Sequence, residues 1–478
     1  MLLSIDVGTS GVRASLYDER GNEVPGARAH SPRPISISNF GELYPNRLVN
    51  EVVDTIDQVP FNVAVDHIAI SAFWHSLLGV DSAGRPTTKL LTWADTRAAQ
   101  FANDLRSQFN EAEIHHRTGC RFYPSYWPAK LRWLQHEHHD DFNRTHWWLG
   151  FAEFLCLRLF GETAASVSTA SATGLFNQHN CDWDWEFIDA LGLFRETLPN
   201  IKTQADARLT EEFASRWPAL AEARLVTVVG DGAANNIGAG CSTKDKIVLM
   251  VGTSGAMRVV YAGGPPAHLD AGLWCYRANR GRVVVGGALS DGGGVVQWLY
   301  ESLNLYGDAA AMEEKVATLE PDAHGLTVLP FWSGERSTGW HADARGGIFG
   351  LRQQTKPFEI YRAVLESIAY RFALIARALD EVAPNATIAA SGNALRSSPV
   401  WLQIIADVLG RPLLLGGPAE ASSRGAALLA LEAVGKIATI EEEQIAIDRV
   451  FDPDMSRHAR YQEGLARQEE LYNRLYRK

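Results

Sequence analysis

The sequence predicts an α/β protein built from two similar domains. Strand-like apolar segments alternate with helix-like segments along the chain, a pattern typical of sheets covered by helices. A chain of 478 residues is too long for one hydrophobic core. The pentapeptide Val-Gly-Thr-Ser-Gly occurs at 7–11 and again at 251–255, about half a chain apart. Together these observations indicate a duplicated architecture.

Both copies of the pentapeptide are predicted to form tight hairpin turns. Each copy follows an apolar run, 2–5 or 247–250, and leads into a second run, 12–17 or 257–261. Turns of glycine and hydroxyl residues expose backbone N–H groups that bind phosphate oxygens. A single copy is most simply an ordinary β-turn. The identity of the two copies and their spacing favour a pair of phosphate-binding hairpins, one in each domain.

The first half begins with strands and then becomes helical. Strands are expected at 2–7, 12–17 and 67–72, with a turn at 81–84. Helices with an apolar face are expected at 95–108, 128–139 and 151–160, with breaks at Thr118-Gly119 and Gly161. A strand at 225–229 ends in Gly230-Asp231-Gly232, and a helix is expected at 233–239. This half therefore closes with a strand, a turn and a helix.

The second half repeats this plan, so we predict domains at 1–243 and 244–478. A hairpin at 247–261 is followed by a strand at 282–287 and a helix from 293 to about 304. The later elements are expected in this order: helix 357–379, strand 387–390, a turn at Gly392-Asn393, helix 398–409, a small-residue helix opening at 425–427, and a solvated terminal helix at 455–478.

Composition restricts the class of partner. The formal net charge is −11 and no run of Lys or Arg exceeds a pair, which argues against nucleic acid and anionic membrane surfaces. No apolar run reaches membrane-spanning length, and no signal-peptide pattern opens the chain, so we expect a cytoplasmic protein. The five cysteines lack any CxxC spacing, which predicts reduced thiols packed in cores. A small molecule is the expected partner, and the sequence leaves open whether the chain forms a homodimer.

Two aspartates at predicted strand ends are candidates for chemistry. Asp6 lies directly before the first hairpin, where a carboxylate either bonds the turn or holds Mg²⁺ beside a bound phosphate. Asp231 lies between two glycines at the start of a helix, where aspartate is a favourable cap. A carboxylate in that place can also accept a proton from a substrate hydroxyl during phosphoryl transfer. The local sequence permits both readings of each residue.

A second group of residues suits a carbohydrate. His75, Trp93, Asp95 and Arg97 occur in two short segments with turn character. Sugars bind to flat apolar surfaces beside fixed polar groups, and these side chains supply both. A core tryptophan with a surface Asp/Arg pair is the simpler interpretation of this group taken alone.

Motifs along nearly the whole chain resemble the FGGY carbohydrate kinases, members of the actin-like, ribonuclease-H-like ATPase superfamily. The resemblance rests on both hairpins and on these segments: Trp-x-Asp-x-Arg at 93–97, Ser-Ala-Thr-Gly-Leu-Phe at 171–176, Gly-Asp-Gly at 230–232, Gly293 to Leu299, Gly-Glu-Arg at 334–336, Gly-Gly-Ile-Phe-Gly-Leu at 346–351 with 359–366, and Gly-Ala-Ala at 425–427. It implies two ribonuclease-H-like domains with ATP and sugar in the cleft between them.

The resemblance also implies a role for each matching position. Asp231 corresponds to the catalytic base and Asp6 to the carboxylate on the Mg²⁺ side. The nucleotide positions are Thr9, Ser10, Arg13, Gly252, Thr253, Gly293, Gln297, Gly392, Asn393 and Ser397. Family members usually carry a glycine where this chain has Asn393, which leaves the adenine contact open. His75, Trp93, Asp95 and Arg97 fall on the sugar side.

Local features favour the gluconokinase branch. These are the segments 75–78 with 92–97, the Asp231-Gly232 pair where xylulokinases and glycerol kinases have an amide after the aspartate, and Gly334-Glu335-Arg336. Bulky aromatics at 123–130 depart from gluconokinase-like sequences and keep xylulose, another ketopentose or a polyol as the alternative. A gluconate carboxylate would require a cation, for which Arg97, Lys130 and Arg336 are candidates.

Two functions of other classes are compatible with the same fold. A non-catalytic sugar or nucleotide sensor would be expected to lack the base or a hairpin, whereas this chain retains Asp231 and both hairpins. An actin-type ATPase switch would not need the 75 and 93–97 segments. The sequence therefore favours a sugar or sugar-acid kinase that uses ATP and Mg²⁺.

Overall fold

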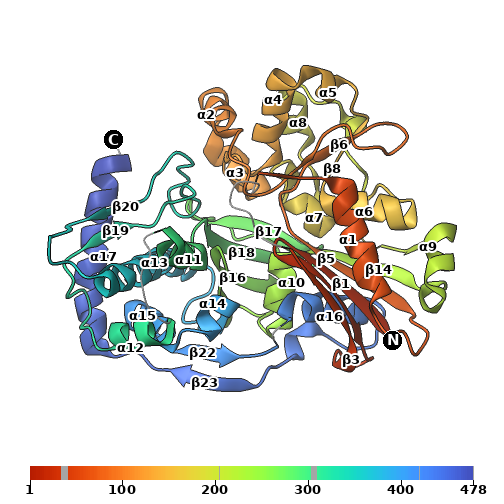
Figure 1. The fold of residues 1–478 in the computed structure, drawn as a ribbon. Helices are drawn as coiled ribbons and strands as arrows, with labels where there is room; N and C mark the ends of the chain where they lie inside the picture. Colours follow the sequence, from red (N-terminus) through yellow and green to blue (C-terminus); the bar gives the residue numbers. More distant parts are fainter. Residues whose placement is uncertain (34–40, 204, 303–308, 419, 477–478) are drawn as a thin grey trace.

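The protein has two large sheets, one of six and one of seven strands, each covered by helices (Figure 1). The computed structural model describes residues 1–33, 41–203, 205–302, 309–418 and 420–476. Each sheet has its own hydrophobic core, and a third cluster of buried residues joins segments from both halves of the chain. The predicted two-domain α/β architecture is confirmed.

The N-terminal sheet positions both candidate aspartates at one edge. Its strands, in spatial order, are β13 (Ala207–Arg208), β14 (Arg224–Gly230), β5 (His67–Ala72), β1 (Leu2–Gly8), β2 (Gly11–Tyr17) and β3 (Glu23–Pro32). β1, β5 and β14 are parallel, so their carboxyl ends lie together. β1 and β2 form the first hairpin, with Gly8 opposite Gly11. Asp6 and Asp231 therefore approach the same edge of the sheet.

The C-terminal sheet repeats this local arrangement. Its strands, in spatial order, are β17 (Trp274–Asn279), β18 (Arg282–Leu289), β16 (Gly255–Ala262), β15 (Lys246–Val251), β21 (Thr387–Ser391), β22 (Leu413–Gly416) and β23 (Ile447–Phe451). β15 pairs antiparallel with β16 and parallel with β21, as β1 pairs with β2 and β5. The second pentapeptide is thus also a hairpin turn, as predicted.

The helices agree with most of the expected segments. Those of the first half are α1 (Pro45–Asp57), α2 (Ala99–Gln108), α3 (Glu111–Thr118), α4 (Trp127–Glu137), α5 (His139–Asn143), α6 (Phe151–Phe160), α7 (Val167–Ser171), α8 (Trp185–Ala190), α9 (Glu211–Arg216) and α10 (Asp231–Gly238). Those of the second half are α11 (Gly293–Ser302), α12 (Ala309–Ala317), α13 (Pro357–Leu379), α14 (Asn393–Arg396), α15 (Pro399–Leu409), α16 (Ala421–Ala433) and α17 (Met455–Tyr476). The predicted residues 303–304 and 477–478 lie outside the described residues.

Three helices begin two or more residues from the predicted position, and the helix predicted at 128–139 ends at Glu137. The helix expected from residue 95 begins at Ala99, because the side chain and backbone of 92–97 form turns held by Asp95. The helix after β14 begins at Asp231, two residues early, and α16 begins at Ala421. Short strand pairs that were not predicted complete the fold: β4 (Glu42–Leu43) with β7 (Leu90–Leu91), β6 (Leu78–Val80) with β8 (Trp147–Leu149), β9 (Ala165–Ser166) with β12 (Ile201–Lys202), β10 (Phe176–Asn177) with β11 (Asp182–Trp183), and β19 (Thr327–Leu329) with β20 (Gly347–Phe349).

Helix α16 lies on the N-terminal sheet although it comes late in the chain (Figure 1). It contacts β1, β5 and β14 and crosses α10 at very short distance. A Cβ at Gly238 would lie 1.8 Å from the Ala421 carbonyl oxygen, and a Cβ at Gly425 would lie 1.8 Å from that of Ala234. The two backbones therefore touch through glycines, and this crossing joins the two halves of the molecule.

Two expectations from composition can be compared with the structure. All five cysteines are free and buried, as predicted. In the described part of the chain, none of the helices combines the length and the apolar character needed to span a membrane.

Candidate active site

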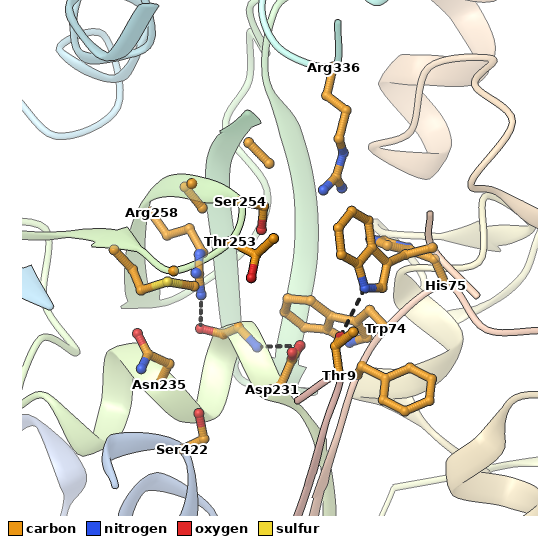
Figure 2. A pocket seen from close by; sticks show the side chains of 18 of the residues that line it. Thr9, Trp74, His75, Asp231, Asn235, Thr253, Ser254, Arg258, Arg336 and Ser422 are labelled. Carbon is orange, nitrogen blue, oxygen red and sulfur yellow. Dashed lines mark hydrogen bonds between the residues drawn. The ribbon is translucent and has the colours of Figure 1, made fainter. Parts of the chain in front are cut away.

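A cavity of about 260 Å³ opens between the two hairpins and is lined by both halves of the chain (Figure 2). Several of the predicted site residues line it: Thr9, Ser10, His75, Trp93, Asp231, Gly252 and Thr253. The fold therefore brings together the two copies of the pentapeptide, the candidate base and part of the candidate sugar group.

Asp231 lies at the carboxyl end of β14, as the first residue of α10. Its flanking glycines allow Trp74 to pack against the backbone, since a Cβ at Gly230 would lie 1.8 Å from the Trp74 ring. The Asp231 side chain does not cap the helix, and its Oδ1 accepts a hydrogen bond from the adjacent Gly232 N–H at 2.8 Å. Burial raises the pKa of the Asp231 carboxyl above its ordinary value, although the nearby Arg258 guanidinium opposes the rise. These are properties of a general base.

Asp6 is buried at the end of β1, next to the first hairpin. Its Oδ1 accepts a hydrogen bond from Ser71 Oγ at 2.8 Å, and its Oδ2 lies 3.9 Å from Arg13 Nη1. Burial raises the pKa of Asp6 to about 6; the Ser71 hydrogen bond and the Arg13 guanidinium oppose this rise, and the charges of Asp231 and Glu420 contribute to it. A buried carboxylate beside the hairpin offers the oxygen ligands that Mg²⁺ prefers.

The first hairpin is oriented from behind by Arg33. The Arg33 guanidinium donates to the carbonyl oxygens of Gly8 and Thr9 at 3.1 and 3.0 Å. The Arg33 backbone N–H donates to the Ser10 oxygen at 2.8 Å, and Glu51 fixes the guanidinium through bonds of 2.7 and 2.9 Å. These bonds occupy the carbonyl oxygens of the turn and fix its conformation.

The second hairpin is held by the first turn of α11. The N–H groups of Gly292 and Gly294 donate to the Thr253 oxygen at 2.9 and 3.0 Å, and Gly293 donates to the Gly252 oxygen at 2.8 Å. Gly392 packs against the same strand, since its Cβ would lie 2.2 Å from the Val251 oxygen. Gly293 and Gly392, which were predicted as nucleotide positions, therefore contact the backbone of this hairpin and of the strand before it.

His75 and Trp93 form part of the cavity wall. His75 has a left-handed backbone (φ 65°), and its ring Nδ1 lies 2.7 Å from the Ala172 oxygen. Burial lowers the pKa of His75 well below its usual value, so the ring is neutral at pH 7. With the proton on Nδ1, Nε2 is an acceptor. Trp93 donates from Nε1 to Thr9 Oγ1 at 3.1 Å, which joins the 92–97 turn to the first hairpin.

Asp95 and Arg97 are not among the residues that line the cavity. The Arg97 guanidinium binds the Asp95 carboxylate at 2.6 Å and Glu42 at 3.0 Å, and it stacks over the Trp133 ring. Asp95 also caps the local turn by accepting the Arg97 N–H at 3.0 Å. The structure thus gives this pair a role in shaping the 92–97 turn, while direct sugar contact stays a prediction.

The other predicted nucleotide residues lie around the cavity rather than on it. Arg13 pairs with Glu420 at 2.7 Å. Gln297, Asn393 and Ser397 are exposed on α11 and around α14, on the C-terminal half. Gln297 donates to Glu301 at 2.7 Å. Their contact with a nucleotide also stays a prediction.

Lys130, one of the three cations proposed for an acid substrate, is fully engaged with the backbone. Its Nζ donates to the carbonyl oxygens of His75 and Thr92 at 2.6 and 2.8 Å. Burial lowers its pKa to about 7. Lys130 therefore joins the segments at His75 and Thr92, and its hydrogen bonds go to the backbone.

Two arginines face the cavity, and sequence reasoning missed one of them. Arg336 reaches in from the loop after β19, over the Trp93 ring at 5.7 Å (Figure 2). Arg258 lies buried on β16 and donates from Nη1 to the Gly232 oxygen at 2.8 Å. Neither forms an ion pair with a carboxylate of the described residues. The sequence feature that could have pointed to Arg258 is its position as an arginine within the otherwise apolar strand β16.

Comparison with known proteins identifies both halves of the chain. The model of the "FGGY family of carbohydrate kinases, N-terminal domain" matches residues 1–238, and the C-terminal model matches residues 248–434. The chain is 28% identical to a gluconokinase of Bacillus subtilis over 91% of this chain and 88% of the relative. Among solved structures, a gluconate kinase from Lactobacillus acidophilus has a TM-score of 0.89 and 27% identity, covering 99% of this chain and 98% of its own. A ligand-bound xylulose kinase from the same organism has the same TM-score and identity, covering 100% of this chain and 98% of its own.

Proposed function

The chain belongs to the FGGY family of carbohydrate kinases, ATP-dependent phosphotransferases that act on a hydroxyl group, and on this premise we propose that it phosphorylates a sugar acid, with gluconate as substrate. Three parts of the molecule would carry this function: the cation that selects the substrate, the group that activates the hydroxyl, and the domain that binds the nucleotide.

The Arg336 guanidinium is the group on which the choice of a sugar acid as substrate rests. It points into the cavity, its Nε is buried without a hydrogen-bond partner, and no carboxylate of the described chain pairs with it. The other two candidate cations, Arg97 and Lys130, are occupied by protein groups. A partly buried guanidinium without a counter-ion is costly, and a bound carboxylate compensates it with charge-assisted hydrogen bonds. An aldonic acid supplies that carboxylate.

Asp231 is assigned as the general base. Arg336 and Asp231 enter the cavity from opposite sides (Figure 2), so a substrate whose carboxylate binds Arg336 would present a distant hydroxyl to Asp231. The Asp231 carboxylate accepts the hydroxyl proton as the oxygen attacks the γ-phosphorus. His75 Nε2 is available to accept a hydrogen bond from a further hydroxyl.

The first hairpin with Asp6 would hold Mg²⁺ through the Asp6 carboxylate, which would neutralise charge on the phosphates. We assign the base and most of the sugar site to residues 1–243 and most of the nucleotide site to residues 244–478, with Arg336 reaching the sugar carboxylate from the second segment. Support comes from the cavity, whose Thr9 and His75 come from the first segment and whose Gly252 and Thr253 come from the second. Thr9, Ser10, Gly252 and Thr253 would contact the phosphates.

A panel assay tests this function. ADP release is measured with gluconate, other aldonic acids, xylulose, glycerol and neutral hexoses. Preference for aldonic acids supports the proposal. Preference for xylulose would support the second candidate, which the aromatic wall of Trp74, Trp274 and Tyr276 and the likeness to a xylulose kinase favour. ATP hydrolysis that no sugar stimulates would instead indicate a switch, and sugar binding without turnover a sensor.

Replacing Arg336 with glutamine is expected to raise KM for gluconate by about 10- to 100-fold, because a charge-assisted pair contributes about 1.5–3 kcal/mol. KM for a neutral sugar should change less than about threefold, and steady-state kinetics on both substrates measures the difference. Arg85→Gln is the matched control, since Arg85 is exposed and pairs with Asp81. Equal losses for gluconate and the neutral sugar would contradict the carboxylate contact.

Replacing Gly252 with valine is expected to raise KM for ATP by about tenfold or more, equivalent to about 1.4 kcal/mol. Gly252 lines the cavity, and among the described residues the nearest atom to a Cβ there is Met250 Sδ at 3.9 Å, an ordinary contact. The melting temperature should stay within a few degrees of wild type. Unchanged KM for ATP would argue against a phosphate at this hairpin.

A further inference from the structure

Arg258 crosses from the C-terminal half of the chain to the base. It lies on β16, shortly after the second hairpin, and its side chain is 4% exposed. Its Nη1 donates to the Gly232 oxygen at 2.8 Å, and its own carbonyl accepts a bond from Asn236 Nδ2 at 2.9 Å. Two contacts to α10 therefore fix the arginine beside the residue that follows Asp231 (Figure 2).

The absence of a side chain at Gly232 makes room for this guanidinium. A Cβ at Gly232 would lie 2.9 Å from Arg258 Nη1 and 2.5 Å from the Trp74 ring. A larger side chain, such as an amide, would occupy the space where the guanidinium lies. The Arg258 guanidinium, which comes from the second half of the chain, thus fills the space that a side chain at residue 232 would take.

The charge of Arg258 has no fixed anion. No carboxylate of the described residues forms an ion pair with it, although Asp231 is close enough to influence it. Burial lowers the pKa of Arg258 to about 10, so it stays protonated at neutral pH. Arg258 lines the cavity together with Asp231 and the second hairpin. A buried guanidinium without an ion pair is suited to bind a phosphoryl group that is transferred between these two parts of the cavity.

We propose that Arg258 is a catalytic residue that stabilises the phosphoryl group during transfer. This proposal rests on the kinase function and on Asp231 as base. The acceptor oxygen forms a bond to the γ-phosphorus while the bond from that phosphorus to the β–γ bridging oxygen breaks. The electron pair of the broken bond leaves with ADP, and the acceptor proton moves to Asp231. Arg258 keeps its proton and donates hydrogen bonds to the three equatorial oxygens of the phosphoryl group. These oxygens carry the negative charge while the group lies between the leaving and the acceptor oxygen.

The variants Arg258→Met and Arg258→Lys test the proposal in the full-length chain. We expect Arg258→Met to lower kcat by about 10²- to 10³-fold, as removal of one transition-state donor does elsewhere. KM for ATP and for gluconate should change less than about threefold. Arg258→Lys retains the charge in a smaller group and should lose about tenfold or more, because an ammonium cannot span the Gly232 oxygen and a phosphoryl group together. Arg85→Met is the surface control.

Two further readouts separate chemistry from structure. Guanidinium ion added to Arg258→Ala should restore part of kcat, a recovery that a purely structural role would not give. ADP with aluminium fluoride and gluconate, a mimic of the transferring group, should bind wild type far more tightly than Arg258→Met, while ADP alone binds both within about threefold.

Three outcomes would overturn the inference. These are a kcat of Arg258→Met within threefold of wild type, equal binding of the aluminium fluoride complex, or a loss confined to KM for gluconate. If Arg258→Met does not fold, Arg258→Lys and the guanidinium rescue decide. Wild-type protein that turns over no member of the sugar panel would defeat the proposed function itself, which distinguishes that failure from failure of the Arg258 assignment.

Discussion

Replacing Asp231 with asparagine is expected to lower kcat by about 10³-fold, within the range of about 10²–10⁴ for loss of a positioned base. The amide keeps the size of the side chain and can still accept the Gly232 N–H, so α10 should begin at the same residue. It cannot take the proton of the acceptor hydroxyl. Coupled ADP-release kinetics measures the loss, and calorimetric binding of gluconate and ATP should remain close to wild type.

The pH profile provides the companion measurement for Asp231. The base must be ionised, and burial raises its pKa above the ordinary value. Activity in kcat/KM should therefore fall as pH decreases through that raised pKa, at higher pH than for an unperturbed carboxyl. Asp231→Asn should lose the part of this acidic limb that Asp231 contributes, while Asp6, with its pKa of about 6, still lowers activity at acidic pH. A kcat within tenfold of wild type, with the limb retained, would assign the base to another group.

Replacing Gly425 with valine is expected to destabilise the protein by at least about 3 kcal/mol, the upper part of the range for overpacked cores. Its Cβ would lie 1.8 Å from the Ala234 oxygen and 2.8 Å from the Gly238 nitrogen. Both close neighbours are backbone atoms, so α10 and α16 must move apart. The move would also disturb the bond of 2.7 Å from Ser4 Oγ to the Ser423 oxygen. Urea unfolding measures the change in the free energy of unfolding.

Two further variants serve as a second test and as a control for Gly425→Val. Gly238→Val acts on the same crossing from the other helix and should give a similar loss. Gly264→Ala is the control, because nothing lies within 4 Å of its Cβ. A free energy of unfolding for Gly425→Val within about 1 kcal/mol of wild type would show that the helices tolerate separation. Since α10 begins with Asp231, a partial separation should lower activity as well.

Much of the local structure could be predicted from the sequence. The hairpins at 7–11 and 251–255 and the helices at 151–160 and 357–379 were confirmed, because apolar periodicity and glycine turns are local signals. Strand β17 was missed. One of its residues, Arg277, is a buried arginine bonded to the Gln178 backbone, and a polar residue of this kind obscures the strand pattern.

The candidate site could be predicted only in part. Asp231 lines the cavity, because the carboxyl ends of parallel strands β5 and β14 meet there. Arg97 and Lys130 were equal candidates to Arg336 as partners for a carboxylate. Their engagement by Asp95 and by the His75 carbonyl depends on how distant turns pack, which motif spacing does not report.

The sequence by itself determined the family, the duplicated hairpins and the position of the candidate base, because each is encoded in a short continuous segment. Only the tertiary structure decided which cations face the cavity and which support the loops. It also decided that α16 lies on the N-terminal sheet and that Arg258 reaches Gly232 from the other half of the chain. The physical reason is that the burial and charge pairing of a side chain depend on residues far from it in sequence, whose positions are fixed only when the two halves pack together.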